Sequence, residues 1–222
     1  MKIALIGSRG IPALYGGFET ATEEIGARLA SRGHEVTVYC RPGNGDASEE
    51  YHRGMKKVFV PCLKKKSLET LTHTLMALLH ASRRSFDVLI IMNPANGPLC
   101  VIPRLKGIPF ALHVDGLDWE RSRWPWIGRK FIKFGAWCST KLAPALIADS
   151  HGIEEYYRKH WNRDTVYASY GAMAKESHDP ALLQRFDLNP RKYCLVVARL
   201  EPENHTQFIV DTYLKHDSKI PL

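Results

Sequence analysis

The stretch that decides the fold is Gly7-Ser-Arg-Gly-Ile-Pro-Ala-Leu-Tyr-Gly-Gly-Phe-Glu-Thr20, which follows the apolar run Lys2-Ile-Ala-Leu-Ile6. A short buried strand therefore leads into a glycine-rich loop and then into a helical pattern. Glycine permits positive φ angles and lets another molecule approach the backbone closely. A helix that begins at Gly16-Gly17 would direct N–H groups and the positive end of its dipole at a phosphate, a diphosphate or a sugar hydroxyl. The loop is the first candidate binding site, although strand-to-helix turns also use glycine without a ligand.

The loop differs from the dinucleotide-binding fingerprint G-x-G-x-x-G. Two residues rather than one separate Gly7 from Gly10, and the loop is longer than the fingerprint allows. The second predicted strand is followed by Arg41, where an acidic residue that binds ribose belongs. Because Arg41 is compatible with a 2′-phosphate, an NADP-dependent oxidoreductase stays open as an alternative.

The composition limits the kinds of molecule that the protein is expected to bind. The chain has 222 residues, a formal net charge of +8 at pH 7 and an isoelectric point near 9.3. This charge favours anionic partners, namely nucleotide diphosphates, acidic lipid headgroups or nucleic acid. The five cysteines form no C-x-x-C pair, which predicts reduced thiols in a cytosol and no metal site. No apolar run approaches the ~18 residues of a membrane span, and neither such a span nor a signal peptide is expected.

Apolar runs that predict strands alternate with helical patterns along the chain. Strands are expected at residues 2–6, 35–40, 57–61, 86–92, 109–114, 145–148 and 164–167, and helices at 18–32, 67–79, up to 105, within 121–141, after 149–152 and at 205–216. The segment between the second and third strands is expected to be a polar, mobile excursion. The alternation predicts an α/β fold with a doubly wound, Rossmann-like parallel sheet and right-handed crossovers.

Two polar loops follow predicted strands. Asn93-Pro-Ala-Asn-Gly-Pro98 comes after the strand at 86–92, and Asp115-Gly-Leu-Asp-Trp-Glu120 comes after the strand that contains His113. Open α/β sheets bind ligands at the carboxyl ends of their strands, so these loops and the glycine loop predict a shared cleft. A lone histidine at a strand end is more often structural than functional, but because Asp115 and Asp118 crowd the same edge here, both interpretations stay open.

The segment 121–141 interleaves basic and aromatic residues and contains no acid. Its members are Arg121, Arg123, Arg129, Lys130, Lys133 and Lys141 with Trp124, Trp126, Phe131, Phe134 and Trp137. Three interpretations stay open: a helix in an anionic membrane interface, a surface that stacks on single-stranded nucleic acid, or a helix whose aromatic residues pack on the sheet while its cations face water. The membrane interpretation assigns the contact to Trp124, Trp126, Arg129, Lys130 and Lys133.

The end of the chain predicts the start of a second domain. Tyr193-Cys-Leu-Val-Val-Ala198 is a strand pattern, and residues 205–216 form a helical pattern. One strand and one helix cannot cover both faces of a parallel sheet, so this domain is expected to be truncated. The expected boundaries are 1–178 for the first domain, 179–192 for a connector and 193–222 for the second.

Together these pieces resemble the GT-B glycosyltransferases of the large retaining group called family 4. Within it the sequence is similar to the branch of bacterial polysaccharide rhamnosyltransferases with a DUF1972-like N-terminal half. The resemblance rests on the glycine loop and on three blocks in the family's order: Asp115-Gly-Leu-Asp-Trp-Glu-Arg121 with Trp124, Ala148-Asp-Ser150, and Val197-Ala-Arg-Leu-Glu-Pro-Glu-Asn204. It implies two Rossmann-like domains across a cleft, with 1–178 on the acceptor side and 193–222 beginning the nucleotide-sugar-binding domain.

The resemblance also implies roles for residues. It places His113 and Asp115, the catalytic candidates, where family members contact the transferred sugar. Arg199 matches the family's phosphate-binding arginine, whereas Asn204 departs from relatives that carry lysine. The substrate-binding residues expected are Arg9, Gly16, Gly17, Phe18, Glu19, Asn93, Asp118, Arg199 and Asn204. No metal or other cofactor is expected, and the nucleotide-diphosphate sugar is the donor substrate.

The expected function is transfer of a sugar, rhamnose in the branch resembled, to a lipid-linked saccharide during capsule or O-antigen biosynthesis. The enzyme is expected to be cytoplasmic and peripheral at the inner face of the cytoplasmic membrane, and the truncated chain is not expected to suffice for activity. A nucleic-acid-binding module and an NADP-dependent oxidoreductase are the alternatives. The sequence leaves open the sugar, the acceptor, the linkage and the oligomeric state.

Overall fold

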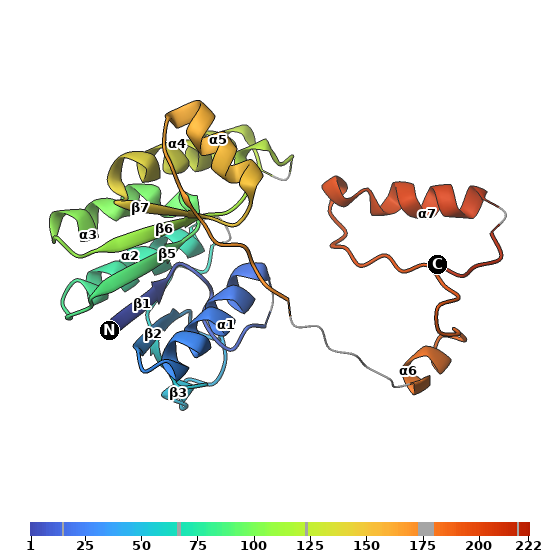
Figure 1. Cartoon of the computed structure of the whole chain (residues 1–222), viewed down its shortest axis with the longest axis horizontal. Helices are drawn as coiled ribbons and strands as arrows, with labels where there is room; N and C mark the ends of the chain where they lie inside the picture. Colours follow the sequence, from blue (N-terminus) through green and yellow to red (C-terminus); the bar gives the residue numbers. More distant parts are fainter. Residues whose placement is uncertain (15, 66–67, 123, 173–179, 217) are drawn as a thin grey trace. The chain divides into compact units, whose positions relative to one another are not determined.

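The computed structural model describes residues 1–14, 16–65, 68–122, 124–172, 180–216 and 218–222. The chain divides into two compact units, one made of Met1–Glu120 and Trp124–Gly171 and the other formed mainly by Ala172–Leu222. The first unit contains one eight-stranded sheet with helices on both faces (Figure 1). The α/β fold class predicted from the sequence is therefore confirmed.

The sheet of the first unit has the strand order β3-β4-β2-β1-β5-β6-β7-β8. All neighbours are parallel except β3 and β4, which form an antiparallel hairpin. The order reverses between β1 and β5, which is the switch point of a doubly wound sheet. The strands are β1 Lys2–Ile6, β2 Glu35–Cys40, β3 Tyr51–His52, β4 Met55–Phe59, β5 Val88–Met92, β6 Phe110–Val114, β7 Ala145–Ala148 and β8 Val166–Tyr167.

Helices follow the strands as the alternating pattern predicts. In the first unit they are α1 Gly17–Ser31, α2 Glu69–Ala81, the 3-10 helix η1 Pro94–Cys100, α3 Val101–Leu105, the 3-10 helix η2 Asp118–Glu120, α4 Trp126–Leu142 and α5 His151–Trp161. The second unit contains α6 Pro180–Gln184, the 3-10 helix η3 Pro202–Asn204 and α7 Thr206–Lys215. None of the helices in the described parts of the chain is long and apolar enough to cross a membrane.

The core lies on the two faces of the sheet. One cluster includes Ile6, Leu112 and Leu146 and is covered by residues of α2, α4 and α5. The other includes Leu5 and Val38 and is packed against α1. Because side chains alternate between faces along a strand, residues one position apart belong to different clusters. This alternation decides on which face of the sheet a side chain lies at the carboxyl ends of the strands.

Helix α4 packs with its small residues inward. Gly135, Ala136 and Ser139 are buried, and a Cβ at Gly135 would lie 2.7 Å from the carbonyl oxygen of Pro94 in η1. The two backbones approach each other so closely that no large side chain fits between them. The aromatic residues of α4, namely Trp126, Phe131, Phe134 and Trp137, are exposed, which contradicts for these four the interpretation in which the aromatic residues pack on the sheet. Trp124, which precedes the helix, does pack against the core.

Two local predictions were wrong. The polar excursion after β2 contains the short strand β3, which turns into β4 at Arg53 and Gly54 with φ angles of 49° and 80°. Two consecutive positive φ angles are typical of a tight hairpin. An Arg-Gly pair predicts such a turn less clearly from the sequence than Asn-Gly does. The segment 193–198 does not form a strand, because a strand needs a paired neighbour and the described residues of the second unit provide none.

Candidate functional site

The glycine loop is fixed to the strands on both sides of β1. A Cβ at Gly7 would lie 2.5 Å from the carbonyl oxygen of Met92, and one at Gly10 would lie 2.7 Å from the Cα of Cys40. Both glycines also have positive φ angles, of 99° and 115°. These two positions are therefore glycine because of packing within the sheet, and the ligand argument applies to the Gly16-Gly17 pair instead.

Two glutamates of α1 accept hydrogen bonds from the backbone of the glycine loop. The backbone N–H of Arg9 donates to Oε1 of Glu19 at 3.2 Å, and the N–H of Ala13 donates to Oε2 of Glu23 at 2.5 Å. Glu19 is buried, so it organises the loop. Burial raises the pKa of Glu23, but bonds from His52, Ala13 and Arg53 outweigh it and leave the pKa below its ordinary value.

The start of α1 faces the carboxyl edge of the sheet without a side-chain cap. Gly16 occupies the N-cap position with φ 106°, and among the described residues this helix start has no side-chain cap hydrogen bond. Gly17 is exposed, and in the part of the chain that the structure describes a Cβ on it would meet the ring of Tyr170 at 3.8 Å. A helix start without a side-chain cap suits a phosphate or hydroxyl oxygen.

His113 lies at the carboxyl end of β6 between two aromatic rings. Its ring stacks on Tyr170, with centroids 5.5 Å apart and planes 7° apart, and meets the edge of Phe18 at 5.7 Å. The side chain is only 5% exposed, and neither ring nitrogen has a hydrogen-bond partner among the described residues. Burial lowers the pKa of His113, an effect that Asp149 offsets in part, so the imidazole is neutral at pH 7.

Three carboxylates influence this stack of rings electrostatically. The pKa of Tyr170 is raised, first by burial and then by the negative charges of Asp115, Asp149 and Glu19. A neutral imidazole beside carboxylates and helix N–H groups offers acceptors and donors for the hydroxyls of a sugar. The cluster of Phe18, Glu19, His113, Asp115, Asp149 and Tyr170 is hereafter called the edge cluster.

Sequence reasoning missed Asp149 and Tyr170 as members of the edge cluster. Asp149 directly follows β7, and Tyr170 lies three residues after β8. Ligands of open α/β sheets bind beyond the carboxyl ends of the strands, so this rule could have indicated both residues as candidates. Asp149 lies in the block Ala148-Asp-Ser150 on which the family resemblance rests, so a signal was present there, whereas no motif marked Tyr170.

Three other predicted substrate-binding residues, Asn93, Asp118 and Arg9, lie in loops or short helices that follow β5, β6 and β1. Asn93 has φ 75° and accepts a hydrogen bond from the N–H of Ala95 at 2.9 Å, so its side chain caps η1. Asp118 is half-buried in η2, and Arg9 is exposed on the glycine loop. Their roles in binding remain predictions.

The structure gives Arg41 a different environment from that of a nucleotide-binding arginine. It is buried, forms an ion pair with Glu69 at 3.1 Å and donates to Oγ1 of Thr70 at 3.0 Å. Burial lowers its pKa, although Glu69 acts in the opposite direction. These contacts tie the loop after β2 to the start of α2 and occupy the group on which the oxidoreductase alternative depended.

Arg199 and Asn204 belong to the second unit. The side-chain amide of Asn204 donates to the carbonyl oxygen of Arg199 at 2.8 Å, which closes the turn ahead of α7. Both side chains are described within that unit only, and their assignment to a leaving diphosphate stays a prediction.

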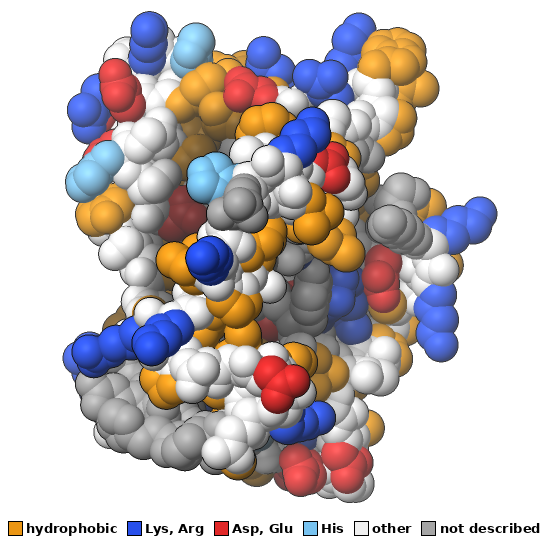
Figure 2. Space-filling view, turned by 90° about the vertical axis from the view of Figure 1, so that its right-hand side faces the viewer, with side chains coloured by type: hydrophobic (Ala, Val, Ile, Leu, Met, Phe, Trp, Pro, Cys, Tyr) orange, Lys and Arg blue, Asp and Glu red, His pale blue; other side chains and the backbone are white. Residues whose placement is uncertain are grey.

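The residues predicted to contact a membrane have unequal surroundings. Trp126 is 64% exposed, and the Nζ of Lys130 lies 4.5 Å from the centroid of its ring. Trp124 is half-buried against the core, and Nε of Arg129 donates to the carbonyl oxygen of Trp119 at 2.5 Å. Over the face shown in Figure 2, lysine and arginine side chains (blue) are scattered among hydrophobic ones (orange).

Solved structures with the same fold include several glycosyltransferases. HepE from Anabaena, in complex with UDP and glucose, has a TM-score of 0.71 at 13% identity, covering 99% of this chain and 59% of that one. Sucrose-phosphate synthase from Thermosynechococcus elongatus has a TM-score of 0.60 at 16% identity, covering 86% and 54%. Arabidopsis thaliana UGT89C1, complexed with UDP-L-rhamnose, has a TM-score of 0.61 at 15% identity, covering 100% and 67%.

The chain thus spans about half of the length of sucrose-phosphate synthase. Because the sequence identities are this low, the similarity shows the GT-B fold alone. No curated protein sequence matches the chain. One family model, described as "Domain of unknown function (DUF1972)", matches residues 1–173. The match covers most of the sequence, including the glycine loop and the whole edge cluster, and the chain therefore belongs to the DUF1972 family.

Proposed function

We propose that the chain is the acceptor-side part of a glycosyltransferase that moves a sugar from a nucleotide-diphosphate donor to a lipid-linked saccharide. The observation that carries the proposal is the buried imidazole of His113, which has no hydrogen-bond partner among the described residues and contacts Phe18 in the first turn of α1. A buried polar group without a partner is costly in a folded protein, and a ligand that supplies the partner removes this cost.

The edge cluster provides the parts of a sugar site. A neutral ring nitrogen of His113 accepts a hydrogen bond from a sugar hydroxyl, and Asp115 accepts a second one. The N–H groups at Gly17 and Phe18 bind a phosphate or hydroxyl oxygen at the positive end of the helix dipole. Catalysis would come from positioning and from neutralisation of charge on the leaving diphosphate, to which Arg199 is assigned.

The outward face of α4 supports membrane attachment of this enzyme. Phe134 is 51% and Trp137 45% exposed, and their rings stack with centroids 5.9 Å apart. Lys130 and Lys133 lie on the same exposed side of the helix. Aromatic rings beside lysines suit the headgroup region of an anionic bilayer, where lipid-linked acceptors reside. Peripheral location at the inner face of the cytoplasmic membrane and a role in capsule or O-antigen synthesis belong to the same proposal.

Rhamnose is the proposed sugar, on the resemblance to the rhamnosyltransferase branch of family 4; one structure of the same fold was solved with UDP-L-rhamnose. The test measures turnover of a panel of nucleotide sugars with a lipid-linked acceptor, for the chain of 222 residues and for a form extended past Leu222. We expect turnover in the extended form and its loss in His113→Ala. Lack of turnover in both forms with every donor would reject the proposal.

A further inference from the structure

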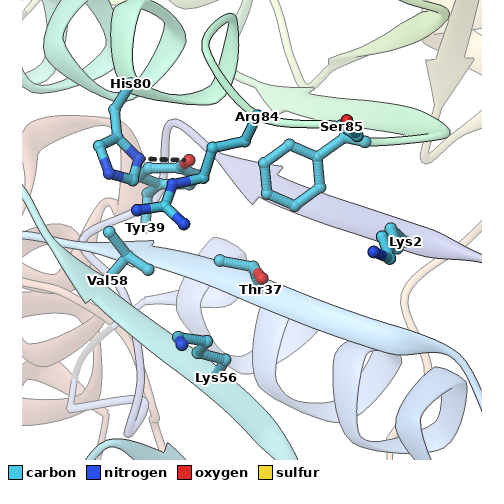
Figure 3. A pocket seen from close by; sticks show the side chains of 9 residues that line it. Lys2, Thr37, Tyr39, Lys56, Val58, His80, Arg84 and Ser85 are labelled. Carbon is cyan, nitrogen blue, oxygen red and sulfur yellow. Dashed lines mark hydrogen bonds between the residues drawn. The ribbon is translucent and has the colours of Figure 1, made fainter.

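A pocket lies on the face of the sheet beside the C-terminal end of α2 (Figure 3). Its volume is about 410 Å³, which is within the usual range of small-molecule sites. Strands β1, β2 and β4 form its floor, and the chain that follows α2 forms its wall. The lining residues are Lys2, Thr37, Tyr39, Lys56, Val58, His80, Arg84, Ser85 and Phe86.

This pocket is separate from the edge cluster. Tyr39 belongs to the core cluster that α2, α4 and α5 cover, as does Leu112 of β6. His113 follows Leu112 directly, so its side chain points to the opposite face of the sheet, where Phe18 of α1 contacts it. A ligand in the pocket therefore does not touch His113.

The sequence places polar residues where a covered sheet face normally carries apolar ones. Lys2, Thr37 and Lys56 point into the pocket from three neighbouring strands, while their chain neighbours Ile3 and Met55 are buried in the opposite cluster. Helix α2 ends at Ala81 and leaves this part of the face uncovered. Helices cover this face of the sheet elsewhere, and a covered face rarely carries lysine. The lysines here therefore indicate that the pocket is hydrated or occupied by a polar molecule.

The charges that line the pocket are all positive. Lys2 and Lys56 have acidic neighbours outside it, Glu35 at 3.9 Å and Glu50 at 2.8 Å. Arg84 has no ion pair and no side-chain hydrogen bond in the part of the chain that the structure describes, and Figure 3 shows its guanidinium directed into the pocket. A pocket lined by a guanidinium and two lysines attracts a multiply charged anion.

The remaining lining groups are neutral donors and apolar surfaces. Tyr39 and Nδ1 of His80 share a hydrogen bond of 2.9 Å, drawn as the dashed line in Figure 3. Burial lowers the pKa of His80, and the nearby Arg84 and Arg83 lower it further. The hydroxyls of Thr37 and Ser85 add donors, and the ring of Phe86 adds a flat apolar wall.

We propose that this pocket binds a small organic phosphate, with the phosphate group held by Arg84, Lys56 and Lys2 and the organic part lying against Phe86. A phosphate dianion matches the planar donors of a guanidinium and the point charges of two lysines. The recessed position between helix and sheet favours a small molecule over an extended polymer. The proposal does not depend on the glycosyltransferase function.

The test titrates the folded chain with glucose 1-phosphate, with inorganic phosphate and with glucose, followed by backbone amide NMR. We expect the two phosphates to shift the resonances of residues around Lys2, Lys56 and Arg84, and glucose to shift none of them. Arg84→Gln should weaken phosphate binding by about tenfold or more, because one charge-assisted bond is lost. Arg84→Lys, which keeps the charge, should weaken binding less.

The matched control is Arg83→Gln, which removes the same charge from a neighbouring residue that does not line the pocket. It should leave phosphate binding almost unchanged, and so should His113→Ala on the opposite face. Equal losses in Arg83→Gln and Arg84→Gln would mean that phosphate is attracted by net charge alone. That result, or shifts confined to the edge cluster, would overturn the proposal, and melting temperatures confirm that each variant is folded.

Discussion

His113 and Tyr170 stack with their ring planes only 7° apart, and the two residues come from different strand ends of one sheet. The tyrosine covers a histidine whose two nitrogens have no hydrogen-bond partner among the described residues. Together with Phe18 it forms an apolar wall around a polar ring. Burial behind such a wall lowers the pKa of His113 and favours the neutral imidazole.

Removal of the stacking ring is expected to raise the pKa of His113. Burial holds that pKa below its ordinary value of 6.5, and Tyr170→Ala exposes the ring to water. The shift is read from the imidazole resonances in an NMR pH titration. Tyr167→Ala is the matched control, because Tyr167 stacks on His151 instead, with centroids 4.0 Å apart. An unchanged His113 pKa in Tyr170→Ala would show that other groups shield the imidazole.

The carboxylate of Glu23 is expected to stabilise the protein in a pH-dependent way. Its pKa in the folded state lies below the ordinary value of 4.5, so its contribution is present above about pH 4.5 and is lost as the pH falls through the folded-state pKa. Glu23→Gln should lower the free energy of unfolding by about 1 to 3 kcal/mol at pH 7 and by less in acid. Urea unfolding of both proteins at pH 7 and at acid pH measures the difference.

The exposed Glu155 on α5 provides the control for this prediction. Glu155→Gln should leave the free energy of unfolding within about 0.5 kcal/mol of the parent, as most surface substitutions do. If Glu23→Gln destabilises the protein equally at both pH values, the carboxylate charge is not what His52 and Arg53 recognise.

Alanine at Gly10 is expected to disrupt the glycine loop. The new Cβ would meet Cys40 and would also require a residue with a side chain at φ 115°. The two effects together should cost about 2 to 5 kcal/mol. Gly33→Ala separates them, because Gly33 has φ 86° but open space around its Cβ, and it should cost about 1 to 2 kcal/mol. Thermal or urea unfolding that ranks the two variants equally would contradict the contact with Cys40.

The exposed face of α4 is expected to bind anionic vesicles in a salt-dependent manner. Trp126→Ser and Trp137→Ser should reduce sedimentation with vesicles that contain phosphatidylglycerol, and Lys130→Gln should weaken binding by about fivefold, or roughly 1 kcal/mol. Lys159→Gln on α5 removes the same charge elsewhere and should have a smaller effect. Equal effects of the two lysine changes would reject α4 as the contact surface.

The same variants test the nucleic-acid alternative. The basic and aromatic face would be assigned to nucleic acid if two results were obtained. Single-stranded oligonucleotides would bind the parent protein more tightly than vesicles do, and Trp126→Ser and Trp137→Ser would lose this binding. We expect only weak oligonucleotide binding that disappears at moderate salt, as for any basic protein.

The sequence by itself determined the order of elements, because the periods of apolar residues report local structure. The runs at β1, β5 and β6 were readable in this way. The parallel sheet followed from the alternation of strands and helices, and the carboxyl edge followed as the place for a ligand. These features depend on residues close together in the chain.

Only the tertiary structure decided which side chains meet. Gly7 and Gly10 serve packing against β5 and β2, Tyr170 covers His113, and Arg84 closes a basic pocket over β2 and β4. The buried stripe of α4 consists of small residues because η1 approaches it closely, and this turned its aromatic side chains outward. A local pattern specifies a helix or a strand, but the partner that each face meets depends on contacts between distant parts of the chain.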